Sequence, residues 1–362
     1  MPDRKRLEVK HETAYHYQHA VALGYSLAWL TPRATDAQEL LEHRLQVTPK
    51  PRFQHESSDG FGNTRHYFEV QKAHSDLRIH SYAVVECAAA PDVLALTEPW
   101  ENLCPEGIVG ADSSPPAWDC IYPTELAPQH PDYTAYARVV FTPGRPLGEA
   151  LLAFNRQLHT DFQYLPGSTD VDTPLAQVWE SRAGVCQDFA HFAIAALRGL
   201  GLAVCYVSGY LLTYPRPGEE KRIGVDASHA WFAVWAGEYG WIHLDPTNDS
   251  VVGDEYIVLA MGRDYADTPP VQGVCFGGGA HRLSVGVTVT DLTGSTVERQ
   301  ADLDMSHPSD QQSDSLKTSG DDAGDDRMDA VGRVTQEANT DDHTDAVVST
   351  TQEPKPDSRE SA

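Results

Sequence analysis

The stretch from Ser181 to Leu197 constrains the fold more than any other part of the sequence. A glycine-marked turn leads into apolar residues at helical spacing: Phe189, Phe192, Ala193, Ala196 and Leu197. This spacing predicts a buried helix with Cys186 at or just inside its first turn. The N-terminus of a helix favours the thiolate form of cysteine, which is the nucleophile. Cys186 is therefore a candidate nucleophile, although an isolated cysteine is more often a buried core residue.

Downstream of this helix the apolar pattern changes from helical spacing to alternation. Three strands are predicted, at residues 203–213, 229–235 and 241–245. The last two are joined by a short loop with two glycines and predict a hairpin. We therefore expect a cysteine-bearing helix packed on an antiparallel sheet.

His229 and Asp245 lie on this predicted hairpin. If Trp235 pairs with Trp241, His229 and Asp245 share one face of the sheet, offset by one residue pair and roughly 7 Å apart at Cβ. A slip of one residue would send them to opposite faces. A cysteine, a histidine base and an aspartate that orients the base are what nucleophilic acyl transfer requires.

Other interpretations of these residues are weaker. His243 shares the predicted face of His229 and is the second choice of base. His191 lies about 140° around the helix from Cys186 and is not expected to reach the thiol. Cys186, His229 and Asp245 could bind zinc, but a fourth ligand is missing at ordinary spacing, so we expect neither a metal nor another cofactor.

Four runs of sequence surround the three residues: GVCQDFAHF, GYLL, DASHAWFAVW and GWIHLDPTND. Together they resemble the bacterial transglutaminase-like family of the papain-related cysteine enzymes. The likeness extends over residues 5–292 and includes HETAYHY, DGFGN, AHSDL, GRDYAD and VQGV. Two residues depart from the family pattern, since Gln187 stands where an arginine is frequent and Tyr256 where a histidine is frequent. Neither departure removes a member of the expected triad, so they bear on substrate preference.

The resemblance implies a mechanism for this site. Cys186 would attack a carboxamide or peptide carbonyl and form a thioester, while His229, oriented by Asp245, relays the protons. The backbone N–H of Cys186 would contribute to the oxyanion hole, with Tyr164 as a candidate second donor. Candidates for lining the substrate site are Trp231 and Gln187.

Hydrolysis of an amide or peptide bond is favoured over amine transfer, because an unprotected thioester reacts with water. Three alternatives remain. The first is a transglutaminase that cross-links protein glutamines, and the second is a catalytically silent scaffold or binding module. The third is a metal-dependent enzyme.

The fold class predicted for the whole chain is α+β. Residues 1–90 are expected to form an antiparallel β-sandwich-like module, followed by a linker region at 91–145. The papain/transglutaminase-like core, with C-terminal strands, is expected at 146–292. Residues 293–362 are a predicted disordered acidic tail, because residues 301–362 hold 16 acidic and 5 basic residues and no aromatic residue.

Charge and hydropathy restrict the expected binding partners and the expected cellular location of the protein. The formal net charge of −26 argues against nucleic acid or an anionic membrane surface as partner, so a protein or peptide substrate is expected. No run approaches the ~18 apolar residues of a membrane helix. The basic N-terminus is not followed by the apolar segment of a signal peptide, and a cytoplasmic location is expected.

The six cysteines do not predict a disulfide framework, because their spacing is irregular and includes no CxxC. Cys205 lies in an apolar run and is predicted to be a small buried hydrophobic residue. Cys104 and Cys120 flank a proline-rich loop and could pair in an oxidising compartment, which a cytoplasmic location argues against.

Overall fold

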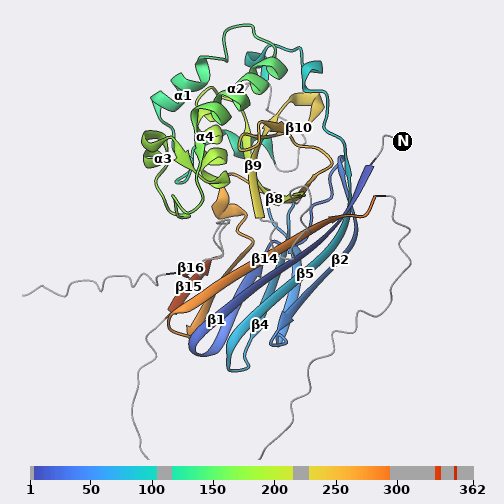
Figure 1. The fold of residues 1–362 in the computed structure, drawn as a ribbon, viewed down its shortest axis with the longest axis vertical. Coiled ribbons are helices and arrows are strands. Elements are labelled where there is room, and N and C mark those ends of the chain that lie inside the picture. Colours follow the sequence, from blue (N-terminus) through green and yellow to red (C-terminus); the bar gives the residue numbers. More distant parts are fainter. Residues whose placement is uncertain (1–3, 104–115, 215–227, 294–330, 336–345, 349–362) are drawn as a thin grey trace, which may run out of the picture.

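The computed structural model describes five stretches of the chain: residues 4–103, 116–214, 228–293, 331–335 and 346–348. Within them the fold is α+β, as expected. A nine-stranded and a five-stranded antiparallel sheet form separate layers, and four α-helices gather beside the smaller sheet (Figure 1).

The long strand β1 (Arg4–Ala28) organises the larger sheet. Six further strands pair with it or with its neighbours: β2 (Gln38–Thr48), β3 (Phe53–Ser58), β4 (Thr64–Val70), β5 (His74–Ala88), β13 (Val271–Gly277) and β14 (His281–Asp291). The first half of β1 lies between β5 and β14, and the second half lies between β4 and β13. Alternating burial along β1 and β5 matches the alternation in their sequences.

The predicted boundaries of this module need two corrections. Residues 271–291, expected in the core at 146–292, lie in the N-terminal sheet as β13 and β14, because β1 offers each of them an edge that β4 and β5 do not cover. The predicted tail at 293–362 also contributes two short strands to this sheet. Strand β15 (Val331–Thr335) pairs with β13, and β16 (Ala346–Val348) pairs with β14. The rest of the tail lies outside the described residues.

The helical layer consists of α1 (Pro131–Arg138), α2 (Leu147–Asp161), α3 (Leu175–Ser181) and α4 (Cys186–Arg198). The central helix of this layer is α4. Every residue of α4 is buried, including the polar Gln187, Asp188, His191 and Arg198. Helix α1 and the buried Trp100 belong to the predicted linker at 91–145, yet they share one hydrophobic core with α4, so the described part of this region packs as part of the helical layer.

The smaller sheet has the strand order β11 (Ser250–Val251), β10 (Trp241–Asp245), β9 (Ser228–Trp235), β8 (Val204–Leu211) and β12 (Tyr256–Gly262). The predicted hairpin register is confirmed, since Trp241 pairs with Trp235 and His243 pairs with Ala233. Helix α4 packs against β8 and β9. This packing brings the N-terminal end of α4 to the beginning of β9.

A disulfide joins Cys120 to Cys205, with their Cα atoms 5.5 Å apart and both residues fully buried. Cys205 is buried as predicted, but it is disulfide-bonded, and Cys104, the predicted candidate partner of Cys120, lies outside the described residues. The short 3-10 helix Ala117–Ile121 contacts β8, and this tertiary contact brings together two cysteines 85 residues apart.

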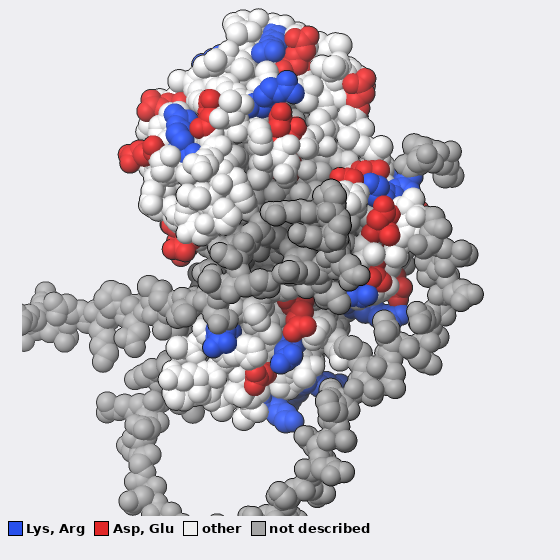
Figure 2. All heavy atoms as spheres, in the orientation of Figure 1, with Lys and Arg blue, Asp and Glu red and all other residues white. Residues whose placement is uncertain are grey.

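Charged side chains are spread over the face that Figure 2 shows. Acidic and basic side chains of the described residues are interspersed there, with broad areas of neither kind between them. None of the described helices is long and apolar enough to cross a membrane.

Candidate active site

Cys186 is the first residue of α4 and is 2% exposed. The turn before it is fixed by Asp188, whose Oδ2 accepts the backbone N–H of Val185 at 2.7 Å and the hydroxyl of Thr169 at 2.6 Å. This is the acidic half of a capping box. A side chain at position 184 would place its Cβ 2.6 Å from Asp188 Oδ2, so the site requires Gly184.

His229 stands at the beginning of β9 with its side chain 11% exposed. Its Nε2 lies 2.7 Å from Oδ2 of Asp245, and the side chain of Cys186 lies close enough to the ring to affect its pKa. Since Nε2 is taken by the carboxylate, Nδ1 is the nitrogen that is left for the thiol. Burial alone would lower the pKa of His229, but the charge and hydrogen bond of Asp245 and the neighbouring Cys186 raise it well above its ordinary value.

Asp245 ends β10 and is fully buried, yet its carboxylate accepts five hydrogen bonds. Oδ2 accepts from His229 Nε2 (2.7 Å), Asn248 Nδ2 (2.7 Å) and the Tyr256 hydroxyl (2.9 Å). Oδ1 accepts the backbone N–H groups of Thr247 (2.9 Å) and Asn248 (3.3 Å). Burial favours the neutral acid, but the charge of His229 and these donors hold the pKa of Asp245 below its ordinary value.

The structure thus brings the three residues of the predicted triad together, with His229 hydrogen-bonded to Asp245 and next to Cys186. The carboxylate fixes which nitrogen of His229 carries the proton toward it and favours the charged ring. A histidine held in this way can accept the proton of the Cys186 thiol, and the N-terminus of α4 stabilises the resulting thiolate.

The two rejected histidines have structural partners elsewhere. Nδ1 of His243 accepts the indole N–H of Trp231 at 3.0 Å, and burial lowers the pKa of His243 to about 4. Nε2 of His191 accepts the backbone N–H of Tyr265 at 3.1 Å, and burial lowers the pKa of His191 to about 3. Both rings are therefore neutral near pH 7.

The two predicted substrate-lining residues do not fit that role. Trp231 is fully buried and packs edge-on against Tyr256, at 5.4 Å between ring centroids. Gln187 is 3% exposed, and its Nε2 donates to the backbone oxygen of Val171 at 3.1 Å. The first side chain supports the sheet and the second holds the loop before α3, so neither offers a surface to a substrate.

Tyr164 lies close to the start of the cysteine helix. The strand β6 (Gln163–Tyr164) pairs in parallel with β7 (Ala183–Gly184), and Tyr164 stands opposite Gly184. Tyr164 is thereby paired with the residue two positions before Cys186, near the place where a second oxyanion donor is expected.

Sequence reasoning missed four residues of the site, although each had a local signal. Asp188 stands at the third position of the helix, where a capping acid is favoured. Thr247 and Asn248 follow an Asp-Pro pair, a pattern typical of a turn closed by the aspartate side chain. Tyr256 stood out only as a departure from the family pattern.

The three residue types of this site are also common metal ligands. Among the residues that the structure describes, no group of three or more His, Cys, Asp or Glu side chains is arranged to hold a metal ion. At this site His229 is hydrogen-bonded to Asp245 and lies next to Cys186.

Comparison with known proteins places this site in a family. The model of the bacterial transglutaminase-like N-terminal region matches residues 7–86, and that of the transglutaminase-like superfamily matches residues 134–246. The uncharacterized protein Rv2569c of Mycobacterium tuberculosis is 42% identical over 279 residues, which cover 75% of this chain and 88% of the relative. The chain belongs to the transglutaminase-like superfamily.

Two further relatives are similar to this chain. The uncharacterized protein ML0607 of Mycobacterium leprae is 31% identical over 291 residues, covering 79% of this chain and 99% of the relative. A protein-glutamine gamma-glutamyltransferase of Pseudomonas aeruginosa is 31% identical over 104 residues, covering 27% of this chain and 16% of that enzyme. At the level of the family, these matches support an enzyme of cysteine-based acyl transfer.

The fold is also found in a solved structure. A candidate cysteine protease of Cytophaga hutchinsonii superposes with a TM-score of 0.63 at 21% identity, over 80% of this chain and 91% of that one. At this identity the likeness establishes the shared transglutaminase-like fold.

Proposed function

We propose that this transglutaminase-like protein is a cysteine peptidase or amidase that hydrolyses an amide bond of a protein or peptide substrate through a thioester at Cys186. The observation that carries the proposal is the hydrogen bond between His229 and the buried Asp245, with Cys186 beside the same ring. Its three residue types and their order match the roles of nucleophile, base and orienting acid.

The first half of the reaction forms the acyl-enzyme. His229 takes the thiol proton, the sulfur of Cys186 bonds to the substrate carbonyl carbon, and the carbon–nitrogen bond breaks. His229 returns the proton to the leaving amine, so no other reactant is consumed. The backbone N–H of Cys186, at the free N-terminal end of α4, and Tyr164 are the proposed donors to the oxyanion.

In the second half, water attacks the thioester with His229 as base, and the acid and the free thiol are released. Amine transfer needs a binding channel for the amine that excludes water, and tryptophans on the face of His229 are the side chains that would line it. The complete burial of Trp231 favours hydrolysis, because this ring does not line such a channel. The relationship to a protein-glutamine gamma-glutamyltransferase keeps amine transfer as the second candidate.

The test uses a glutamine-bearing peptide with and without millimolar primary amine, with both products followed by mass. We expect deamidated or cleaved peptide as the main product, and predominant amine incorporation would make this enzyme a transglutaminase. An electrophilic peptide should label Cys186 in the wild type, and failure to label a folded protein would support a silent scaffold. Activity that a chelator abolishes and an added metal restores would indicate a metal-dependent enzyme.

The cytoplasmic location remains a prediction, and the Cys120–Cys205 bond bears on it. Disulfides persist mainly in oxidising compartments, so this bond favours such a compartment over the cytoplasm. Peptide mapping of the native protein under non-reducing conditions, after thiol blocking in the cell, distinguishes the two.

A further inference from the structure

Strand β12 lies at the edge of the smaller sheet and pairs along one side with β8. Its first residue, Tyr256, donates its hydroxyl to Asp245 at 2.9 Å. The position of this edge strand therefore affects the carboxylate that orients His229. An edge strand without a partner presents open N–H and C=O groups along its other side.

Gln38, from β2 of the N-terminal module, occupies the open side of β12. Its Oε1 accepts the backbone N–H of Val258 at 2.8 Å, and its Nε2 donates to the oxygen of Val258 at 2.9 Å. The same Nε2 donates to the oxygen of Arg33 at 2.7 Å. The side-chain amide, 3% exposed, thus takes the place of the peptide group of a neighbouring strand.

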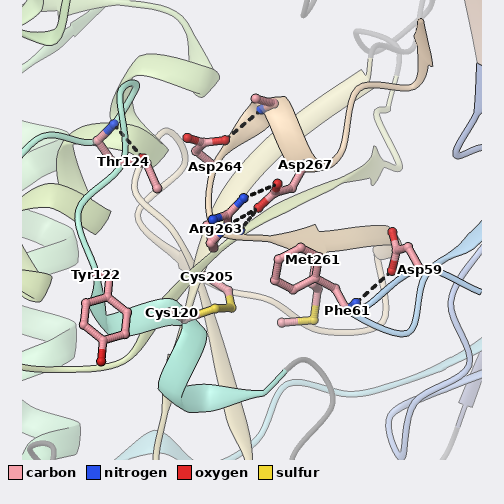
Figure 3. Close-up of polar contacts among 12 residues, drawn as sticks. Asp59, Phe61, Cys120, Tyr122, Thr124, Cys205, Met261, Arg263, Asp264 and Asp267 are labelled. Carbon is pink, nitrogen blue, oxygen red and sulfur yellow. Dashed lines mark hydrogen bonds and ion pairs between the residues drawn. A yellow bond between two sulfur atoms is a disulfide. The ribbon is translucent and has the colours of Figure 1, made fainter.

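Asn63 repeats this arrangement further along the strand. Its Oδ1 accepts the backbone N–H of Met261 at 2.8 Å, and its Nδ2 donates to the oxygen of Met261 at 2.8 Å. Asn63 is fully buried and is held by Asp59 Oδ2 at 3.0 Å and by Arg33 Nη1 at 2.8 Å. Figure 3 shows the loop from Asp59 to Phe61 lying beside Met261.

The spacing of the two contacts has a structural cause. Outward-facing peptide groups on a strand recur at every second residue, whereas Val258 and Met261 are three residues apart. The register of β12 against β8 shifts between Val258 and Ala260. This irregularity turns both peptide groups toward the N-terminal module.

The loop after β12 extends the connection to the cysteine helix. The backbone N–H of Tyr265 donates to His191 at 3.1 Å, and the buried Arg198 donates to the oxygen of Arg263 at 2.6 Å. His191 and Arg198 both belong to α4. The strand held by Gln38 and Asn63 is therefore bonded to Asp245 at its beginning and, through the loop, to the helix of Cys186 at its end.

We propose that Gln38 and Asn63 are positioning residues for acyl transfer, and that the N-terminal module acts through them as a clamp on β12. This assigns a role to the DGFGN motif, whose last residue is Asn63. The proposal rests on the proposed function, because it concerns the alignment of Asp245 and His229 with Cys186. Misplacing a reacting group by about 1 Å is enough to slow a reaction while the fold persists.

The test measures alkylation of Cys186 by iodoacetamide, with the labelled residue identified by peptide mass, together with kcat and KM on a peptide amide. Gln38→Met fills the same space without the amide. We expect alkylation and kcat to fall about tenfold while KM stays within about twofold, as for a loss of alignment. Gln46→Met is the control, because Gln46 is exposed on the same strand and should behave as wild type.

A double-mutant cycle separates positioning from a general loss of stability. If Gln38 acts through Tyr256, Gln38→Met should change alkylation much less in the Tyr256→Phe background than in the wild type. If Gln38→Met and Tyr256→Phe each lower alkylation by the same factor alone and in combination, Gln38 does not act through Tyr256. Gln38→Asn, one methylene shorter, is the milder variant should Gln38→Met fail to fold, and Asn63→Leu tests the second contact.

The outcomes distinguish this inference from the proposed function. Wild-type alkylation and kcat in folded Gln38→Met and Asn63→Leu would refute the clamp and leave the function intact. A wild-type protein that alkylates rapidly at Cys186 but turns over no amide would refute the proposed function and leave the clamp intact. A wild-type Cys186 with no enhanced reactivity would refute both.

Discussion

Asp245→Asn is the sharpest test of the candidate site. The carboxylate accepts three donors at Oδ2 and two backbone N–H groups at Oδ1, and it is fully buried. An asparagine that keeps its oxygen toward the backbone turns its NH2 group toward His229. Nε2 must then accept, so the proton moves to Nδ1 and the ring can no longer take the proton of Cys186.

The productive tautomer requires the amide to turn round, which points its NH2 group at the backbone N–H groups of Thr247 and Asn248. Both donors are part-buried, so leaving them unsatisfied costs at most about 1–3 kcal/mol each, or about 2–6 kcal/mol in all. Each 1.36 kcal/mol is a factor of ten in rate. We therefore expect kcat/KM of Asp245→Asn to fall between about 30-fold and 10⁴-fold, which is less than the loss caused by Cys186→Ala.

The assay is steady-state turnover of a peptide amide by the folded variant, checked by circular dichroism. The matched control is Asp249→Asn, four residues away, because Asp249 bonds to Asn155 and Arg156 and adopts a φ of 48°, which asparagine tolerates. The control should keep wild-type kcat/KM. Retention of more than a third of wild-type kcat/KM by Asp245→Asn would refute the assignment of the base and its orienting acid.

Three further predictions follow from the same contacts. His229→Ala should abolish turnover, whereas His243→Ala should keep kcat near wild type. His243→Ala should lower the melting temperature, because it leaves the buried indole N–H of Trp231 without an acceptor. Equal losses of kcat in the two variants would contradict the choice of base. Replacing both Cys120 and Cys205 by Ser should lower stability in denaturant melts by at most about 4.6 kcal/mol, the loop-closure entropy for an 85-residue separation. An unchanged midpoint would count against the disulfide. Burial lowers the pKa of His11 and His191 to about 3 and that of His43 and His243 to about 4. These rings therefore contribute fully to the free energy of unfolding above pH 6.5, and this contribution is lost as the pH falls toward 4. The loss of stability is at most about 1.4 kcal/mol per pH unit for each ring. His229 has a raised pKa and acts in the opposite sense, so its contribution is lost as the pH rises. A melting temperature that stays constant between pH 6.5 and 4.5 would contradict the prediction for the four buried rings.

The sequence alone was sufficient for the local elements of the core. The helical spacing after Gly184 predicts α4, and the alternation from His229 to Asp245 predicts a hairpin whose register the structure confirms. Both signals are local, because a helix repeats every 3.6 residues and a strand every two. The juxtaposition of His229 and Asp245 followed directly from that register.

Contacts between distant parts of the chain were beyond the sequence. The pairing of β13 and β14 with β1 joins residues more than 240 apart, and alternation within a strand does not tell which edge the strand joins. The same holds for the bond between Cys120 and Cys205, since spacing alone leaves the partner of each cysteine open.

The sequence by itself determined which residues could carry acyl transfer and on which elements they stand, because residue chemistry and hydrophobic period are local properties. The tertiary structure decided which side chains support them. Tyr256 reaches Asp245 only because β12 completes the smaller sheet, and β12 is held by amides from an N-terminal module that lies about 200 residues away in the chain. Such support depends on how two layers pack, and no periodicity within either layer encodes it.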